Sequence, residues 1–204
     1  MFTRRTALSL LAGAGLVPLV APGLARAQSL ETEGPLGDLW LGAEDAPVTV
    51  IEYASLTCSF CARYHDQTFP HVKETYIETG KIRYTMREFP LDPLATAGFM
   101  LARCDEENFY PIADLLFETQ RQWAFAERPL DALSNLMRQA GFSQERFESC
   151  LRDQAVFDAV NDVRERGAAL GVNSTPTFFF NGERRSGALT IEEFDAIVRP
   201  LLPS

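Results

Sequence analysis

A strand, a helix and a second strand follow one another between residues 48 and 88, and this unit constrains the fold more than any other feature. Val48 to Ala54 is rich in β-branched and aromatic residues, which is typical of a buried strand. A helix is expected from Cys58 to about Glu78, interrupted near Pro70 and closed by Gly80. Lys81 to Glu88 alternates with period two and predicts a second strand. Such a unit normally pairs its strands in parallel through a right-handed crossover.

The segment from Leu94 to Leu170 shows no strand pattern. Pro111, Pro129 and Gly141 divide it, so we expect four or five helices there. The apolar residues that recur at helical spacing are Phe109, Ile112, Leu115, Leu116, Leu133, Leu136 and Met137. This segment is therefore a helical insertion between the first strands and those that follow.

Strand signals return near the C-terminus. Thr177 to Phe180 predicts a strand, Asn181-Gly182 a type I′ turn, and Glu183 to Ala188 the hairpin partner. Thr190 followed by Glu193 is a capping-box pattern for a final helix. The predicted order is β-α-β, a helical insertion, and then β-β-α.

The N-terminal residues 1–27 have the pattern of a signal peptide. Arg4 and Arg5 precede an apolar run, and Ala25-Arg26-Ala27 supplies the small-x-small pattern before a cleavage site. The paired arginines also resemble a twin-arginine signal, so both export routes stay open. The apolar run is short and rich in Gly and Pro, which disfavours a retained membrane anchor. A lead-in with a short strand near Trp40 would follow.

The charge balance disfavours some partners. The chain carries a formal net charge of −9, and removal of residues 1–27 leaves 16 basic against 28 acidic residues. An acidic surface of this kind repels nucleic acid and anionic membranes. With 46% hydrophobic residues, the chain can bury one core that carries an inserted subdomain.

The motif Cys58-Ser59-Phe60-Cys61 lies where the first strand gives way to the first helix. Cysteines three positions apart share a helix face, so their sulfur atoms can form and reopen a small disulfide. The upstream sulfur lies beside free backbone N–H groups at the positive end of the helix, which favours the thiolate. Cys58 is therefore the predicted nucleophile and Cys61 the resolving thiol.

Other uses of a C-x-x-C pair need different surroundings. Zinc would need a second close pair, but Cys104 and Cys150 are far apart, and the two histidines, His65 and His71, have no familiar zinc spacing. A haem attachment needs His where Ala62 stands. We predict no metal and no cofactor, and a structural zinc or a purely structural disulfide remain as alternatives.

Two distant motifs, Glu52 to Cys61 and Asn173 to Phe178, resemble DsbA-type thioredoxin-fold proteins, above all those of α-proteobacteria and related bacteria. The resemblance covers residues 36–202. It implies an α/β thioredoxin fold with an inserted all-helical subdomain between the second and third core strands. The implied boundaries are a signal peptide at 1–27, a thioredoxin-like domain at 28–90 and 171–204, and the insertion at 91–170.

The resemblance also assigns residues to the site. Pro176 would follow a cis peptide bond and pack against the active-site disulfide, and the main chain of Thr175 would pair with the substrate. Glu52 would be a buried acid that relays a proton to or from Cys61. The alternatives are an ordinary trans turn and a glutamate exposed at a strand edge.

Ser59 and Phe60 depart from the pattern, because many DsbA proteins have Pro and His there. Without an imidazolium beside the thiolate one stabilising charge is missing, although Ser59 can donate a hydrogen bond. The pair is therefore expected to be less oxidising than in those proteins. We expect Ser59, Phe60 and Tyr64 to contact the substrate.

Cys104 and Cys150 lie on predicted helices of the insertion. In an oxidising compartment we expect them to form a structural disulfide, and two buried free thiols or a second redox couple are the alternatives. His65 and His71 are expected to face solvent on the long first helix.

These features predict a periplasmic thiol–disulfide oxidoreductase that introduces disulfides into exported proteins. The resemblance implies reduced exported polypeptides as substrates and a DsbB-like membrane protein as reoxidant. We expect a monomer that binds no nucleic acid and has no stable membrane insertion. A reductase or isomerase, a metalloprotein-maturation factor and a non-enzymatic binding module stay open.

Overall fold

The computed structural model describes residues 30 and 32–203, so the predicted signal peptide lies outside the described residues. The elements are β1 (Val48–Ala54), α2 (Ser59–Gln67), α3 (Phe69–Val72), η1 (Lys73–Ile77), β2 (Ile82–Glu88), α4 (Pro93–Arg103), η2 (Glu106–Asn108), α5 (Phe109–Glu118), α6 (Gln120–Trp123), α7 (Pro129–Gln139), α8 (Gln144–Leu151), α9 (Gln154–Ala169), β3 (Thr177–Phe180), β4 (Glu183–Ser186), α10 (Ile191–Val198) and η3 (Arg199–Leu201). Six α-helices lie between β2 and β3 in this part of the chain, where the sequence predicted four or five. The short α6 was missed because Thr119 separates it from α5 without a Gly or Pro.

The strands form one mixed sheet in the order β2-β1-β3-β4. β1 runs parallel to β2, as the strand–helix–strand unit predicts, and β3 is antiparallel to both β1 and β4. Asn181 and Gly182 have φ values of 45° and 88°, the positive values that a type I′ turn requires. Near the predicted strand at Trp40, the structure has a single antiparallel bridge between Leu41 and Tyr84.

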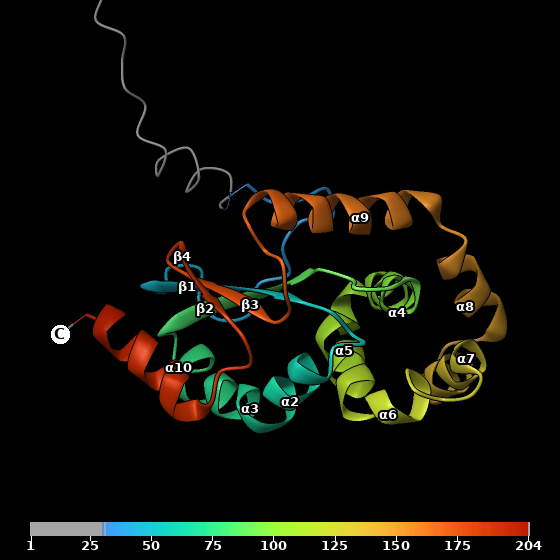
Figure 1. The fold of residues 1–204 in the computed structure, drawn as a ribbon, viewed down its shortest axis with the longest axis horizontal. Helices are drawn as coiled ribbons and strands as arrows, with labels where there is room; N and C mark the ends of the chain where they lie inside the picture. The colour runs from blue at the N-terminus through green and yellow to red at the C-terminus, as the bar shows by residue number, and fades with distance from the viewer. Residues whose placement is uncertain (1–29, 31, 204) are drawn as a thin grey trace, which may run out of the picture.

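Helices cover both faces of the sheet (Figure 1). α9 packs along one face, where Val163 joins the odd-numbered strand residues Ile51, Tyr53 and Phe179. α2, α3 and α10 cover the other face, where even-numbered positions such as Phe178 point. Because side chains alternate along a strand, Glu52 of β1 is directed into the layer beneath α2.

The helical insertion is fastened to the sheet by a buried ion pair. Arg103 at the end of α4 donates to Glu88 at the end of β2, with Nε and Oε1 2.5 Å apart. The same guanidinium donates to the carbonyls of Leu36 and Gly37 in the lead-in. In residues 30 and 32–203, no helix has the length and apolar character needed to cross a membrane.

The first helix is interrupted near Pro70, as the sequence predicts. α2 ends at Gln67, α3 begins at Phe69, and residues Lys73–Ile77 form a π-helical turn. The final helix α10 begins with the predicted capping box, in which Thr190 and Glu193 satisfy each other's backbone N–H groups.

Candidate active site

Cys58 is the N-cap residue of α2, and its own backbone N–H donates to the carbonyl of Ser55 at 3.0 Å. Cys61 lies one turn further along the helix, and both cysteines are free thiols in the structure. The two differ in access, because Cys58 is 8% exposed and Cys61 is completely buried. A partner sulfur can therefore reach Cys58 but not Cys61.

The two thiols also differ in acidity. The pKa of Cys58 is lowered from 9.0 to about 5, chiefly by a hydrogen bond from the Cys61 thiol, although burial opposes this. The Thr175 side chain and the backbone N–H groups of Cys61 and Phe60 lower it further. Burial, the hydrogen bond to Cys58 and the charge of Glu52 raise the pKa of Cys61 well above its ordinary value. Cys58 is thus a thiolate at neutral pH while Cys61 keeps its proton.

The loop before β3 packs against Cys58, although it is more than a hundred residues away. The Cys58 thiol lies 3.2 Å from the carbonyl oxygen of Thr175, and the Thr175–Pro176 peptide bond is cis. The Thr175 hydroxyl is buried and makes no hydrogen bond within the described residues, so it is free to donate to a thiolate. The predicted cis bond and its position beside the cysteines are confirmed.

Glu52 is completely buried beneath α2, so the alternative of an exposed edge glutamate is wrong. Its Oε2 accepts hydrogen bonds from the Tyr84 hydroxyl and from His65, whose Nε2 lies 3.1 Å away. Its Oε1 is buried and makes no hydrogen bond within the described part of the chain. One carboxylate oxygen is therefore held in place, and the other is available.

The predicted solvent exposure of His65 is wrong, and that of His71 is only partial. His65 is buried against Glu52, and Tyr64, although only 1% exposed, contributes to the lining of a surface hollow together with Gln67 and Leu189. His71 is partly buried and binds Asp195 through Nε2 at 3.0 Å. The spacing of Cys61 and His65 was an available signal, because residues four apart lie on the same helix face.

Ser59 and Phe60 lie at the surface, as a substrate contact requires. The Phe60 side chain is 54% exposed, and the Arg63 guanidinium lies 4.8 Å from the centre of its ring. Further exposed apolar side chains are Leu91, Phe125 and Leu130.

Gln120 of α6 also holds the active-site loop, and the sequence analysis missed it. Its side-chain N–H groups donate to the carbonyls of Leu56 at 2.9 Å and Cys58 at 3.1 Å. Nearby, Thr57 donates to Asp92 at 2.6 Å. No local pattern marks Gln120, because its partners are more than sixty residues away in the sequence.

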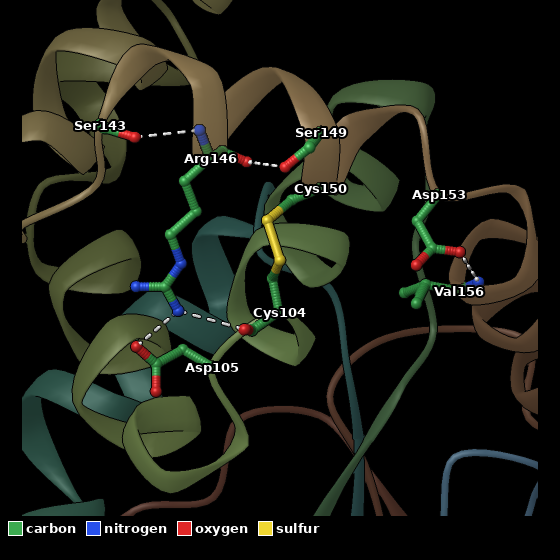
Figure 2. Close-up of a disulfide and its surroundings, with 8 residues drawn as sticks. All are labelled: Cys104, Asp105, Ser143, Arg146, Ser149, Cys150, Asp153 and Val156. Carbon is green, nitrogen blue, oxygen red and sulfur yellow. Dashed lines mark hydrogen bonds and ion pairs between the residues drawn. A yellow bond between two sulfur atoms is a disulfide. The ribbon is translucent and has the colours of Figure 1, made fainter.

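Cys104 and Cys150 form a disulfide between α4 and α8, so the predicted pairing is confirmed (Figure 2). Cys104 is the C-cap residue of α4. Figure 2 shows Arg146 reaching from α8 to the Cys104 carbonyl and the Asp105 carboxylate, at 3.1 Å and 2.9 Å. This disulfide joins two helices of the insertion.

An acidic thiol at a helix N-terminus, a protonated thiol one turn later and a cis-proline loop beside them define a thioredoxin-fold thiol–disulfide oxidoreductase. A thioredoxin family model matches residues 35–199. The structure is similar to α-DsbA1 of Wolbachia pipientis, with a TM-score of 0.78 and 29% identity over 86% of this chain and 95% of that chain. The chain therefore belongs to the DsbA family of thiol–disulfide oxidoreductases, within the thioredoxin superfamily.

Two further comparisons, one by sequence and one by structure, agree with this assignment. A provisionally named protein-disulfide oxidoreductase of Rickettsia bellii is 32% identical over 151 residues, which are 71% of this chain and 57% of that protein. BdbD of Bacillus subtilis has a TM-score of 0.68 at 17% identity, over 80% of this chain and 92% of that chain. The chain spans little more than half the length of the curated Rickettsia relatives.

Proposed function

We propose that this protein is a periplasmic dithiol oxidase that introduces disulfides into exported polypeptides. The observation that carries the proposal is the placement of the two thiols, with Cys58 at the N-cap of α2 beside the Thr175 loop and Cys61 completely buried one turn later. This placement lowers the pKa of Cys58 to about 5 and raises that of Cys61. A thiolate that is stable in the reduced protein makes the corresponding disulfide a better oxidant. The Cys104–Cys150 disulfide supports an oxidising compartment, because such bonds persist there.

The reaction begins with the oxidised protein. A substrate thiolate attacks the sulfur of Cys58, the Cys58–Cys61 bond breaks, and its electron pair moves to Cys61, which takes up a proton. Glu52, whose charge acts on Cys61 from beneath α2, passes that proton. A second substrate thiolate then displaces Cys58, which leaves a substrate disulfide and a reduced Cys58–Cys61 pair.

The surroundings of the pair supply the remaining roles. The Thr175 main chain aligns the substrate beside Cys58, Pro176 shapes that loop, and Ser59 and Phe60 contact the substrate from the helix start. A DsbB-like membrane protein then accepts the electrons from the reduced pair. The protein acts as a monomer on reduced, exported polypeptides.

A redox equilibrium with glutathione tests the direction of the reaction. We expect a reduction potential clearly above that of thioredoxin, about −270 mV, and oxidation of a reduced, disulfide-requiring enzyme by the isolated protein. The Cys58→Ser variant should lose this oxidation. A potential at or below the thioredoxin value would overturn the oxidase in favour of a reductase or a maturation factor.

A further inference from the structure

His65 lies between a fully buried carboxylate and one that reaches solvent. Its Nε2 is 3.1 Å from Glu52 Oε2, and its Nδ1 is 3.6 Å from Asp114 Oδ1 on α5. The His65 side chain is only 2% exposed, whereas that of Asp114 is 48% exposed. Phe117 stacks on the imidazole with ring centres 4.3 Å apart, which holds the ring in this position.

A hollow of about 310 Å³ opens beside this histidine, and its lining includes His65, Lys73, Asp114 and Glu118. Water in this hollow can reach the outer carboxylate but not Glu52, which has no exposed surface. A proton that moves between water and Glu52 on this side must therefore pass the imidazole.

The proposed reaction needs such a proton. Each time the Cys58–Cys61 bond breaks, Cys61 receives an electron pair in a completely buried position. Burial raises the pKa of Cys61 well above its ordinary value, so the new thiolate takes up one proton. Glu52 can hand over a proton only if another group replaces it, because no water reaches the carboxylate directly.

We propose that His65 is the positioning residue through which protons pass between solvent and the buried Glu52–Cys61 pair. In the forward step the imidazolium gives its Nε2 proton to Glu52 and Glu52 gives a proton to the Cys61 thiolate, which leaves a neutral imidazole that keeps on Nδ1 the proton taken up from water on the Asp114 side. The reverse sequence removes the proton when the disulfide re-forms. The inference rests on the proposed thiol–disulfide exchange and adds the route by which Cys61 gains and loses its proton.

The charges around the imidazole suit this role. Burial by itself lowers the pKa of His65, but the charge of Glu52 and hydrogen bonding with both carboxylates outweigh it and raise the pKa to about 9. The titratable and charged groups around it are Glu52 on β1, Tyr84 on β2, Cys61, Tyr64 and Asp66 on α2, Lys73 on η1, and Asp114 and Glu118 on α5. At neutral pH His65 therefore carries the proton that the step requires.

Single-turnover reduction of the oxidised protein by glutathione tests the route. The rate constant per glutathione thiolate should fall by about tenfold as the pH rises through about 9 in the unaltered protein. His65→Gln, which cannot carry the charge, should be about tenfold slower at neutral pH and should lack this inflection. His71→Gln, the matched control, should keep both the rate and the inflection. An unchanged profile in His65→Gln, or the same loss in His71→Gln, would overturn the proposal.

A second pair of variants covers the case in which His65→Gln does not fold. Asp114 and Glu118 both line the hollow and reach solvent, so neither substitution disturbs the core. Asp114→Asn should move the inflection to lower pH, because it removes a charge that raises the pKa of His65. Glu118→Gln should leave it in place, and an unmoved inflection in Asp114→Asn would contradict the route. If the unaltered protein does not react with glutathione at all, the proposed function fails; if it reacts and only these shifts are absent, the His65 route alone fails.

Discussion

The two cysteine pairs of this protein lie at opposite ends of their helices. Cys58 is the N-cap residue of α2, whereas Cys104 is the C-cap residue of α4. Free N–H groups at an N-terminus stabilise a thiolate, and free carbonyls at a C-terminus disfavour one. The same side chain is therefore activated at one place and left as a cross-link at the other.

The surroundings reinforce this difference. The first pair lies above a buried carboxylate that is hydrogen-bonded to a buried histidine, and the charge of this carboxylate helps to raise the pKa of Cys61. The second pair has Arg146 beside it, which binds a carbonyl and a surface carboxylate and not a sulfur. Reactivity thus follows from helix polarity and from the groups behind the sulfur, not from the cysteine alone.

The largest expected effect is the complete loss of exchange in Cys58→Ser, because the reacting sulfur is removed. The double variant Cys104→Ala/Cys150→Ala should keep its rate of glutathione exchange within about twofold, since no sulfur of the second pair lies among the groups that set the pKa of Cys58. Stopped-flow measurement of thiol exchange checks both. A large loss of exchange in a folded double variant would show that the two pairs are not separate in function.

The second pair should matter more than the first for stability, which is the reverse of their order in thiol exchange. The Cys104–Cys150 bond closes a loop of 46 residues, so its removal should lower the free energy of unfolding by about 4 kcal/mol. Urea denaturation of the oxidised double variant and the oxidised unaltered protein measures this difference. A loss below about 1 kcal/mol would mean that the insertion is held by its packing and by the Arg103–Glu88 pair alone.

Local sequence signals predicted the strands, the turn and the caps. Val48–Ala54, Asn181-Gly182 and the Thr190–Glu193 capping box all formed as expected, because each depends on neighbours within a few residues. The two cysteines of the site were equally visible, because a C-x-x-C at a strand–helix junction is local. These features needed no knowledge of tertiary packing.

The rest of the site depends on packing between distant segments. His65 was expected to face solvent, because nothing in the sequence of α2 indicates that Phe117 and Asp114 of α5 pack against it. Gln120 was missed for the same reason, since its role is defined only where α6 meets the active-site loop. Burial of Glu52 followed from family resemblance, and the sequence alone left its exposure open.

Because Cys58 is acidic, reduction of the Cys58–Cys61 bond should stabilise the folded protein, whereas loss of the Cys104–Cys150 bond should destabilise it. Its pKa of about 5 lies below the unfolded value of 9.0, so its contribution to stability is present above about pH 9 and is lost as the pH falls through about 5. The stability of the reduced form relative to the oxidised form should therefore rise between these pH values. The slope should stay below the one-proton limit of about 1.4 kcal/mol per pH unit, because Cys58 keeps partial contact with solvent.

The double variant Cys104→Ala/Cys150→Ala is the right background for this measurement, because reduction then opens only the Cys58–Cys61 bond. Thermal unfolding of the reduced and oxidised forms across this pH range gives the difference. A variant that also carries Cys58→Ser cannot form this disulfide, and its own stability should lack the rise that the reduced double variant shows across the same window. A reduced form that is less stable at every pH would contradict both the acidity of Cys58 and the oxidase proposal.

The smallest expected effect concerns Gln120. This residue connects the helical insertion, which contains the second cysteine pair, to the active-site loop of the first pair. Gln120→Leu leaves the Leu56 carbonyl without its side-chain donor and removes one of two donors from the Cys58 carbonyl, so it should cost about 1–3 kcal/mol of stability. Because these bonds fix the start of α2, the pKa of Cys58 should also rise, as seen in the pH dependence of thiolate absorbance. Gln122→Leu, an exposed neighbour on α6, should change neither quantity. If Gln120→Leu lowers stability but leaves the pKa of Cys58 unchanged, then the insertion supports the active-site loop without tuning its sulfur, and the two pairs are independent in acidity as well as in exchange.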